Sequence, residues 1–144
     1  MIRPSLLAVG PFTKTGDRTA LVKQFIQTLP RLQKSLPQLH LFLVGPGATD
    51  CFKDAGSPPS LVLEDSEKEL ESYIFYVNVL IRMPRSSPLE ESAIGYAAQF
   101  KRPTVSIPRL PLFHFFKRSL VNQVLAEFPA PSSHLNPRAY ATSS

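Results

Sequence analysis

Three loops of the sequence carry residues that could bind an anion or a substrate. They occupy residues 10–16, 45–50 and 84–91, and each follows an apolar run that is typical of a buried strand. Free backbone N–H groups at the start of a helix bind phosphate when hydroxyl groups and cations lie nearby. The first loop has neither a GxGxxG nor a GxxxxGK[ST] spacing, so a plain strand-to-helix turn is the alternative interpretation. The second could equally be a tight turn. The phosphate-binding candidates are Thr13, Lys14, Arg18, Ser86 and Ser87.

Two carboxylates stand beside the third loop. General acid–base catalysis requires carboxylates that project into a pocket, and Glu90 and Glu91 are placed to do so. The alternative is that they stabilise the N-terminal dipole of the helix that Pro88 begins. The acidic residues from Glu64 to Glu71 are interpreted as a solvated helix face.

Metal ligands and cofactor motifs are missing from the sequence pattern. His40 lies in a predicted strand, His114 in an aromatic cluster and His134 near the end of the chain, so no two have metal-ligand spacing. The single cysteine, Cys51, excludes an internal disulfide framework and has no histidine or aspartate at a diagnostic distance. We therefore expect no metal and no cofactor.

The apolar pattern predicts alternating strands and helices. Strands are predicted at 5–10, 39–44, 77–83 and 103–107, with a short apolar piece at 61–63 after a loop at 48–60. Helices are predicted from Asp17 as a cap to a stop or kink at Pro30, from Asp65 or Ser66, from Pro88, and over 112–128. This order predicts an α/β fold of the Rossmann or flavodoxin type, with a parallel sheet of four or five strands. We expect one domain over residues 1–128 and an extended Pro/Ser-rich tail over 129–144.

Composition narrows the class of partner. The chain of 144 residues has a net charge of +5 but no run of five basic residues, so we expect protein or phosphate-bearing partners rather than nucleic acid. No stretch is long and apolar enough to span a membrane. The first sixteen residues lack acids and faintly resemble an organellar presequence, although they include the first predicted strand. An intracellular location, mitochondrial or cytoplasmic, is expected.

Several segments together resemble the nucleoside 2-deoxyribosyltransferase superfamily, which includes the 2′-deoxynucleoside 5′-phosphate N-hydrolases. The segment Ala93-Ile-Gly-Tyr-Ala-Ala-Gln-Phe-Lys-Arg-Pro-Thr-Val105 is similar to the family's helix and following strand, and Leu7-Ala-Val-Gly-Pro-Phe12 to its first strand and loop. Residues 16–21 and 70–83 are similar to the next elements, so the resemblance covers about residues 5–107 in the family's order.

The resemblance implies that catalytic positions have been vacated. The family's catalytic glutamate falls at Ala93, its strand-heading aspartate at Asn78 and its first-strand aromatic residue at Leu7. A methyl group can neither attack an anomeric carbon nor stabilise an oxocarbenium ion. Glu90 or Glu91 could substitute only after a shift of helix register. The alternative is an active nucleotide-processing N-glycosidase or deoxyribosyltransferase that uses one of them.

A second resemblance is to the carboxyl-terminal half of a GT-B glycosyltransferase. It rests on residues 10–14, 39–47 and 84–103. The arginine of that family's first loop falls at Pro11, its second glutamate falls near Tyr96, and its amino-terminal half is absent from this sequence.

The last predicted helix carries more large apolar residues than one face can bury. Phe113, Phe116, Leu120 and Val124 are expected to form one stripe towards the sheet, which leaves Phe115 pointing elsewhere. An exposed aromatic ring beside basic residues is typical of a protein contact. The predicted contact residues are Phe115, Lys117, Arg118, Arg138 and Tyr140. The sequence thus predicts a non-catalytic structural or accessory subunit of a larger assembly, in a hetero-complex or a homodimer.

Overall fold

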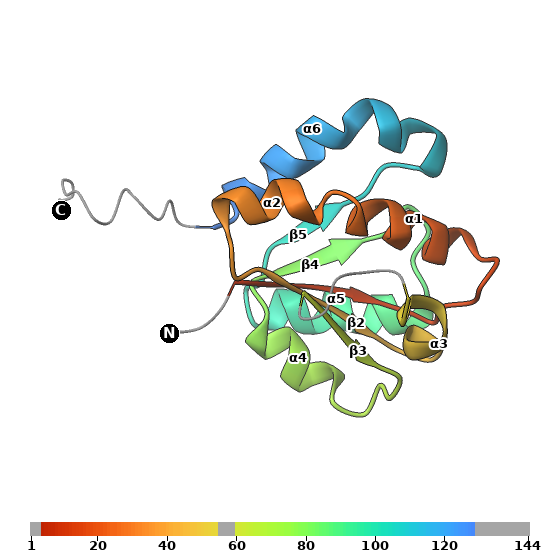
Figure 1. Cartoon of the computed structure of the whole chain (residues 1–144). Helices are drawn as coiled ribbons and strands as arrows, with labels where there is room; N and C mark the ends of the chain where they lie inside the picture. The colour runs from red at the N-terminus through yellow and green to blue at the C-terminus, as the bar shows by residue number, and fades with distance from the viewer. Residues whose placement is uncertain (1–3, 55–59, 129–144) are drawn as a thin grey trace, which may run out of the picture.

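The computed structural model describes residues 4–54 and 60–128, which form a three-layer α/β fold (Figure 1). Its central layer is a sheet of five parallel strands in the order β3-β2-β1-β4-β5. The predicted Rossmann- or flavodoxin-like fold class is therefore confirmed. The strands are β1 (Ser5–Val9), β2 (His40–Val44), β3 (Leu61–Glu64), β4 (Val79–Arg82) and β5 (Thr104–Ser106).

Helices cover both faces of the sheet. Figure 1 shows α1, α2 and α6 above the strands and α4 and α5 below them. The upper layer contains α1 (Asp17–Ile26), α2 (Leu29–Ser35) and α6 (Leu110–Ala126), and the short α3 (Ala48–Phe52) packs into the same core. The lower layer contains α4 (Leu70–Tyr76) and α5 (Pro88–Gln99).

The central strand explains why the apolar runs are continuous. Every residue of β1 is buried. Leu6 and Ala8 join the core beneath the upper helices, whereas Leu7 and Val9 join the core above α4 and α5. A strand that is covered on both faces needs apolar residues at every position, so the lack of alternation indicated a parallel sheet correctly.

Two predicted boundaries were incomplete. The short apolar piece at 61–63 is the edge strand β3, which pairs in parallel with β2 and supplies the fifth strand. Part of the predicted loop at 48–60 is the helix α3, whose Cys51 and Phe52 are buried. A five-residue helix has too few turns to show a period in the sequence, so only the structure reveals it.

The helix starts also differ from the expectation. Asp17 is the first residue of α1 rather than its cap, and Gly16 occupies the cap position without a side-chain hydrogen bond. The predicted interruption at Pro30 is present: α1 ends at Ile26, and Pro30 stands in the first turn of α2. Proline has no N–H to donate to the carbonyl four residues earlier, so one helix cannot continue through it unchanged. The acidic helix begins at Leu70, several residues after the predicted caps at Asp65 and Ser66.

The predicted tail over 129–144, with its candidates Arg138 and Tyr140, lies outside the described residues. No helix in the described part of the chain is long and apolar enough to cross a membrane.

Candidate functional site

The carboxyl ends of β1 and β4 form the topological switch point of the sheet. β1 pairs with β2 on one side and with β4 on the other, so the connections leave these two strands in opposite directions. In open parallel sheets, ligands bind in the crevice outside this point. The loops predicted to bind phosphate, at 10–16 and 84–91, meet here, and the candidate site is therefore described from this crevice outwards.

Arg18 bridges the two sides of the crevice. Its Nη1 donates to the carbonyl of Val9 at 3.0 Å, and its Nη2 donates to the carbonyl of Arg85 at 2.7 Å. The same Nη2 lies 3.3 Å from Oε1 of Glu90. The guanidinium thus links the end of β1 to the loop after β4. The N–H donors that form these contacts are the same groups that would otherwise bind an anion.

Glu90 is the buried partner of this arginine. Its side chain is fully buried, and its Oε2 accepts a hydrogen bond from the backbone N–H of Met83 at 2.9 Å. Both carboxylate oxygens are therefore engaged within the chain. A buried charge requires this kind of pairing, because an unpaired carboxylate in a core costs several kcal/mol, about 3–5 when one partner of a pair is removed.

The serines of the third loop are engaged as well. Ser87 is the N-cap of α5: its Oγ accepts from the N–H of Glu90 at 3.1 Å and donates to the carbonyl of Gly10 at 2.7 Å. The neighbouring Ser86 donates to the carboxylate of the exposed Glu91. Glu91 lies in the first turn of α5, where a negative charge stabilises the helix dipole, and this supports the dipole interpretation.

The first loop contributes little to the crevice. Lys14 forms an ion pair with Asp50 at 3.7 Å, with both side chains largely exposed, and Thr13 is exposed too. The second loop is a tight turn, because Gly47 has a φ of +89° and a Cβ there would lie 2.1 Å from the carbonyl oxygen of Phe12. The structure brings Arg18, Ser87 and Glu90 together but leaves Thr13 and Lys14 at the rim.

The vacated family positions are occupied by structural residues. Leu7 and Ala93 are fully buried in the core between the sheet and α5. Asn78 lies just before β4, where its Oδ1 accepts from the N–H of Ser5 at 2.9 Å. None of the three presents a charged or nucleophilic group.

The remaining titratable candidates stay apart. Among residues 4–54 and 60–128, no group of three histidine, cysteine or acidic side chains could hold a metal ion. Cys51 is a buried free thiol in α3. His40 lies in β2, and its Nδ1 contacts the carbonyl of Gln38 at 2.8 Å.

The outer surface of α6 exposes large apolar side chains. Phe115 is 78% exposed, and Leu112 and Phe116 are each nearly half exposed. The placement of Phe116 in the buried stripe was wrong: Phe113, Leu120 and Val124 face the core. Lys117, rather than Phe116, is the partly buried residue between Phe113 and Leu120, and Arg118 is exposed. We call the exposed residues Leu112, Phe115, Phe116 and Arg118 the α6 face.

A second exposed surface lies on the opposite side of the sheet, which the sequence reasoning interpreted only as a solvated helix face. Phe75 is 61% exposed and Tyr76 46% exposed, beside the exposed acids at the start of α4. Nearby, Tyr73 donates to Glu64 at 3.4 Å, and its pKa is raised by burial and by the charge of that carboxylate. The α4 face consists of Glu67, Glu69, Glu71, Phe75 and Tyr76.

A pocket of about 300 Å³ adjoins the α4 face at Tyr76. Its other lining residues come from the amino-terminal halves of three strands: Ser5, His40, Phe42 and Val62. The Phe42 ring packs against the rings of both Tyr73 and Tyr76, with centroids 5.5 and 5.8 Å away. Successive side chains of a strand point to opposite faces of the sheet, and this alternation brings these residues to one face. The sequence alone does not show the grouping, because it depends on the register between the strands.

Comparison of the chain with protein-family models and with curated proteins found no match. The structure itself defines the class, a Rossmann/flavodoxin-like α/β protein with a five-stranded parallel sheet. Because many unrelated activities share such folds, function must be argued from the surfaces described above.

Proposed function

We propose that this protein is a non-catalytic accessory subunit that binds a protein partner through the α6 face. The observation that carries the proposal is the exposure of Leu112, Phe115 and Phe116 on one side of a single helix. Residues three and four apart share a helix face, so these side chains form a continuous stripe. Burying an exposed side chain of this size contributes about 1.5–3 kcal/mol.

The charge of this region supports a specific contact. The segment 109–126 contains Arg109, Lys117 and Arg118 and no acidic residue. Aromatic anchors beside arginine are typical of the residues that dominate protein interfaces. A surface of this kind costs solubility in an isolated chain, and a partner would remove that cost by covering it.

The crevice supports the non-catalytic part of the proposal. Arg18, Ser87 and Glu90, the polar side chains at the switch point, already bind one another or the backbone of their loops. Glu90 could act on a substrate only after leaving Arg18 and Met83. The resemblance to the deoxyribosyltransferase superfamily fits this proposal as a fold that has lost its chemistry at Leu7, Asn78 and Ala93.

The assembly role is tested by purifying the tagged full chain from its own cells and measuring complexes by native mass spectrometry. The wild-type chain is expected in complexes larger than the monomer. Phe115→Asp is expected to lose it, because it places a carboxylate in the apolar stripe. Asn122→Asp is the matched control: it adds the same charge two turns along the exposed side of α6. Retention of the complex by Phe115→Asp would contradict the proposal.

The catalytic alternative is tested separately with deoxynucleosides and their 5′-monophosphates. We expect no base release and no rise in melting temperature, because a ligand that binds the folded state would stabilise it. Base release that disappears in Glu91→Gln would overturn the non-catalytic interpretation and favour an active N-glycosidase.

A further inference from the structure

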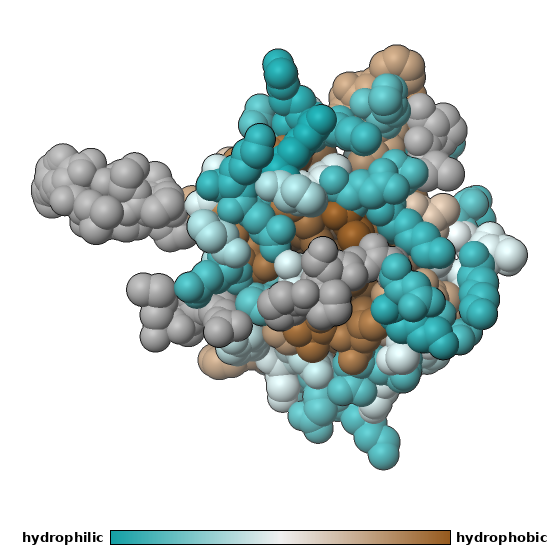
Figure 2. Space-filling model, in the orientation of Figure 1, coloured by the Kyte–Doolittle hydropathy of each residue, from teal (hydrophilic) through white to brown (hydrophobic). Residues whose placement is uncertain are grey.

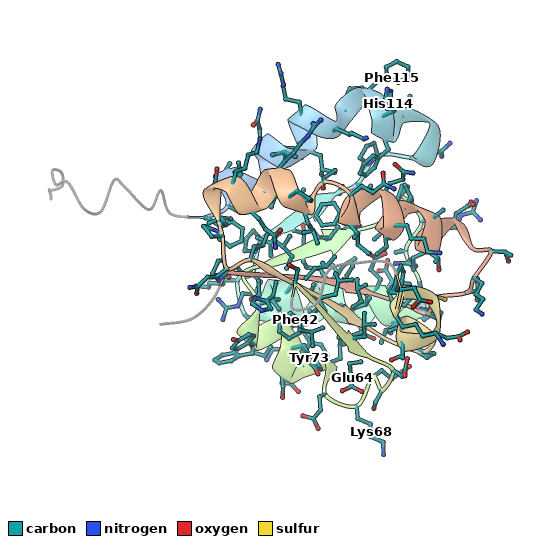
Figure 3. The ribbon with its side chains drawn as sticks, in the orientation of Figure 1. Phe42, Glu64, Lys68, Tyr73, His114 and Phe115 are labelled. Carbon is teal, nitrogen blue, oxygen red and sulfur yellow. The ribbon has the colours of Figure 1, made fainter. Side chains whose placement is uncertain are left out.

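The α6 face and the α4 face lie on opposite sides of the sheet and carry opposite charge. Figure 3 shows Phe115 and His114 on α6 above the strands, and Phe42, Tyr73, Glu64 and Lys68 below them. Figure 2 shows apolar side chains gathered at the same upper end of α6. The two faces therefore lie on opposite layers of the fold, α6 above the sheet and α4 below it (Figure 1).

We infer that these two faces bind each other in different copies of the chain, so that the α6 face of one copy docks on the α4 face of the next. This inference rests on the proposed function, because it names the partner of the α6 face. The partner is a second copy of this protein, held by charge complementarity around exposed aromatic side chains.

The two segments carry charges of opposite sign, and on the α4 side the guanidinium of Arg102 also packs on the Phe75 ring, 5.5 Å from its centroid. Residues 64–71 contain five acidic residues and Lys68, whereas 109–126 contain three basic residues and no acid. Opposite potentials attract across an interface, and like charges placed together are repelled. Pairing of two α6 faces, or of two α4 faces, would bring like charges together, so the complementary pairing is favoured over both.

The apolar parts of the two faces also correspond. On α4, Phe75 follows Glu71 by one turn, so acid and aromatic ring share the outward side of the helix. On α6, Arg118 lies beside the exposed stripe in the same way. The pocket beside Tyr76 offers a hollow with aromatic walls, in which a phenylalanine side chain from the next copy would be buried.

The geometry determines the kind of assembly. Because the faces lie on opposite layers of one molecule, two copies that join through one pair of faces leave one α6 face and one α4 face unfilled. A contact between two different surfaces is heterologous and produces a chain or a closed ring rather than a two-fold dimer. We therefore expect self-association that continues beyond a pair as the protein concentration rises.

The test uses the full chain and two variants, each of which disables one face. Phe115→Asp disables the α6 face, and Glu71→Lys disables the α4 face. Sedimentation velocity at low salt is expected to show wild-type oligomers that grow with concentration, and monomers for each variant alone, with association weakened about tenfold or more. An equimolar mixture of the two variants is expected to form a one-to-one pair, because each supplies the face that the other lacks.

Matched controls separate the contact from general effects of charge. Asn122→Asp and Asp54→Lys change the charge by the same amounts at exposed positions outside the two faces, and both are expected to associate like wild type. Formation of the mixed pair also demonstrates that both variants are folded. Added salt is expected to weaken the wild-type assembly, because exposed charges are screened.

Several results would overturn the inference. A wild-type chain that stays monomeric over the accessible concentrations contradicts it, as does a dimer lost in Phe115→Asp but unchanged in Glu71→Lys, which indicates α6 paired with α6. Binding of the wild-type monomer to vesicles of anionic lipid, without self-association, would assign the α6 face to a membrane surface.

Failure of this inference differs from failure of the proposed function. If wild type is a monomer on its own but forms a complex with another protein that Phe115→Asp abolishes, the accessory role stands and self-assembly is wrong. If Phe115→Asp changes neither self-association nor complex formation, both are wrong.

Discussion

The switch-point crevice and the α6 face contrast in how their functional groups are used. In the crevice, the cation Arg18, the carboxylate of Glu90 and the hydroxyl of Ser87 all have partners within the chain. On the α6 face, the large side chains of Phe115 and Phe116 have surface left to bury. Where this fold ordinarily binds small ligands, these polar groups are already hydrogen-bonded within the chain, whereas on α6 large apolar side chains remain exposed to solvent.

The same contrast exists between the two sides of α6 itself. Phe113, Leu120 and Val124 are buried against the upper core, while Leu112 and Phe115 on the other side are exposed. A helix that only completed this core would not need apolar residues on both sides. The contribution of α6 to stability and its proposed role in binding can therefore be tested by separate substitutions.

The largest effect is expected for the crevice, with Glu90→Ala. The substitution leaves the guanidinium of Arg18 and the N–H of Met83 without their buried partner. Removal of one member of a buried pair costs about 3–5 kcal/mol of unfolding free energy. Urea denaturation followed by circular dichroism measures this loss.

The control for that prediction is Glu91→Ala, whose carboxylate is exposed and bound only to Ser86. Its cost is expected to stay within about 0.5 kcal/mol, as for other surface positions. Equal losses from the two substitutions would show that Glu90 is not the buried support of the crevice, and would reopen a catalytic role for it.

The next effect compares the two sides of α6. Leu120→Ala creates a cavity between α6 and the upper core and is expected to cost about 2–5 kcal/mol of unfolding free energy. Phe115→Ala is expected to cost less than about 0.5 kcal/mol, because the ring is mostly exposed. Thermal and urea unfolding of the variants at low protein concentration, where association is absent, measures both. A large loss from Phe115→Ala would mean that this ring supports the fold and is not reserved for a partner.

Much of the fold could be predicted because local pattern and tertiary environment agree. Residues 6–9 of the doubly buried β1 are all apolar, and Pro88 followed by two acids identified the start of α5. The register of α6 was predicted less well. The sequence placed Phe116 in the buried stripe, whereas in the structure Phe116 is 48% exposed and Lys117 is partly buried.

The residues of the candidate site were identified from the sequence, but the contacts that they make were not. Arg18, Ser87 and Glu90 were identified from types and spacing, yet the sequence could not show that they bind one another, since Arg18 and Glu90 are 72 positions apart. The α4 face was missed because its acids are ordinary for a solvated helix. Only the position of Phe75 and Tyr76 beside them, on the side away from the core, distinguishes it.

A moderate effect is expected for Ser87→Ala at the edge of the crevice. The serine caps α5 and also holds the carbonyl of Gly10, so its loss removes two hydrogen bonds. A cap of this kind contributes about 1 kcal/mol, within a range of about 0.5–2. Ser86→Ala is the control, because that hydroxyl binds only the exposed Glu91. Urea denaturation that gives equal values for the two would contradict the bridging role of Ser87.

The smallest effect concerns Tyr73, which lies beside the α4 face and is not part of the crevice. Burial, followed by the negative charge of Glu64, raises the pKa of its hydroxyl above the ordinary value of about 10. In alkaline solution the unfolded chain therefore loses this proton before the folded chain does. The unfolding free energy falls as the pH rises from about 10 to the pKa of Tyr73 in the folded state. Above that pKa, this group changes the unfolding free energy no further.

Tyr73→Phe removes this part of the alkaline loss while leaving the stability at neutral pH nearly unchanged, because the hydrogen bond to Glu64 is long and partly exposed. Urea denaturation of wild type and variant at about pH 8 and about pH 11 measures the difference, and parallel losses in the two proteins would mean that folding does not raise the pKa of Tyr73.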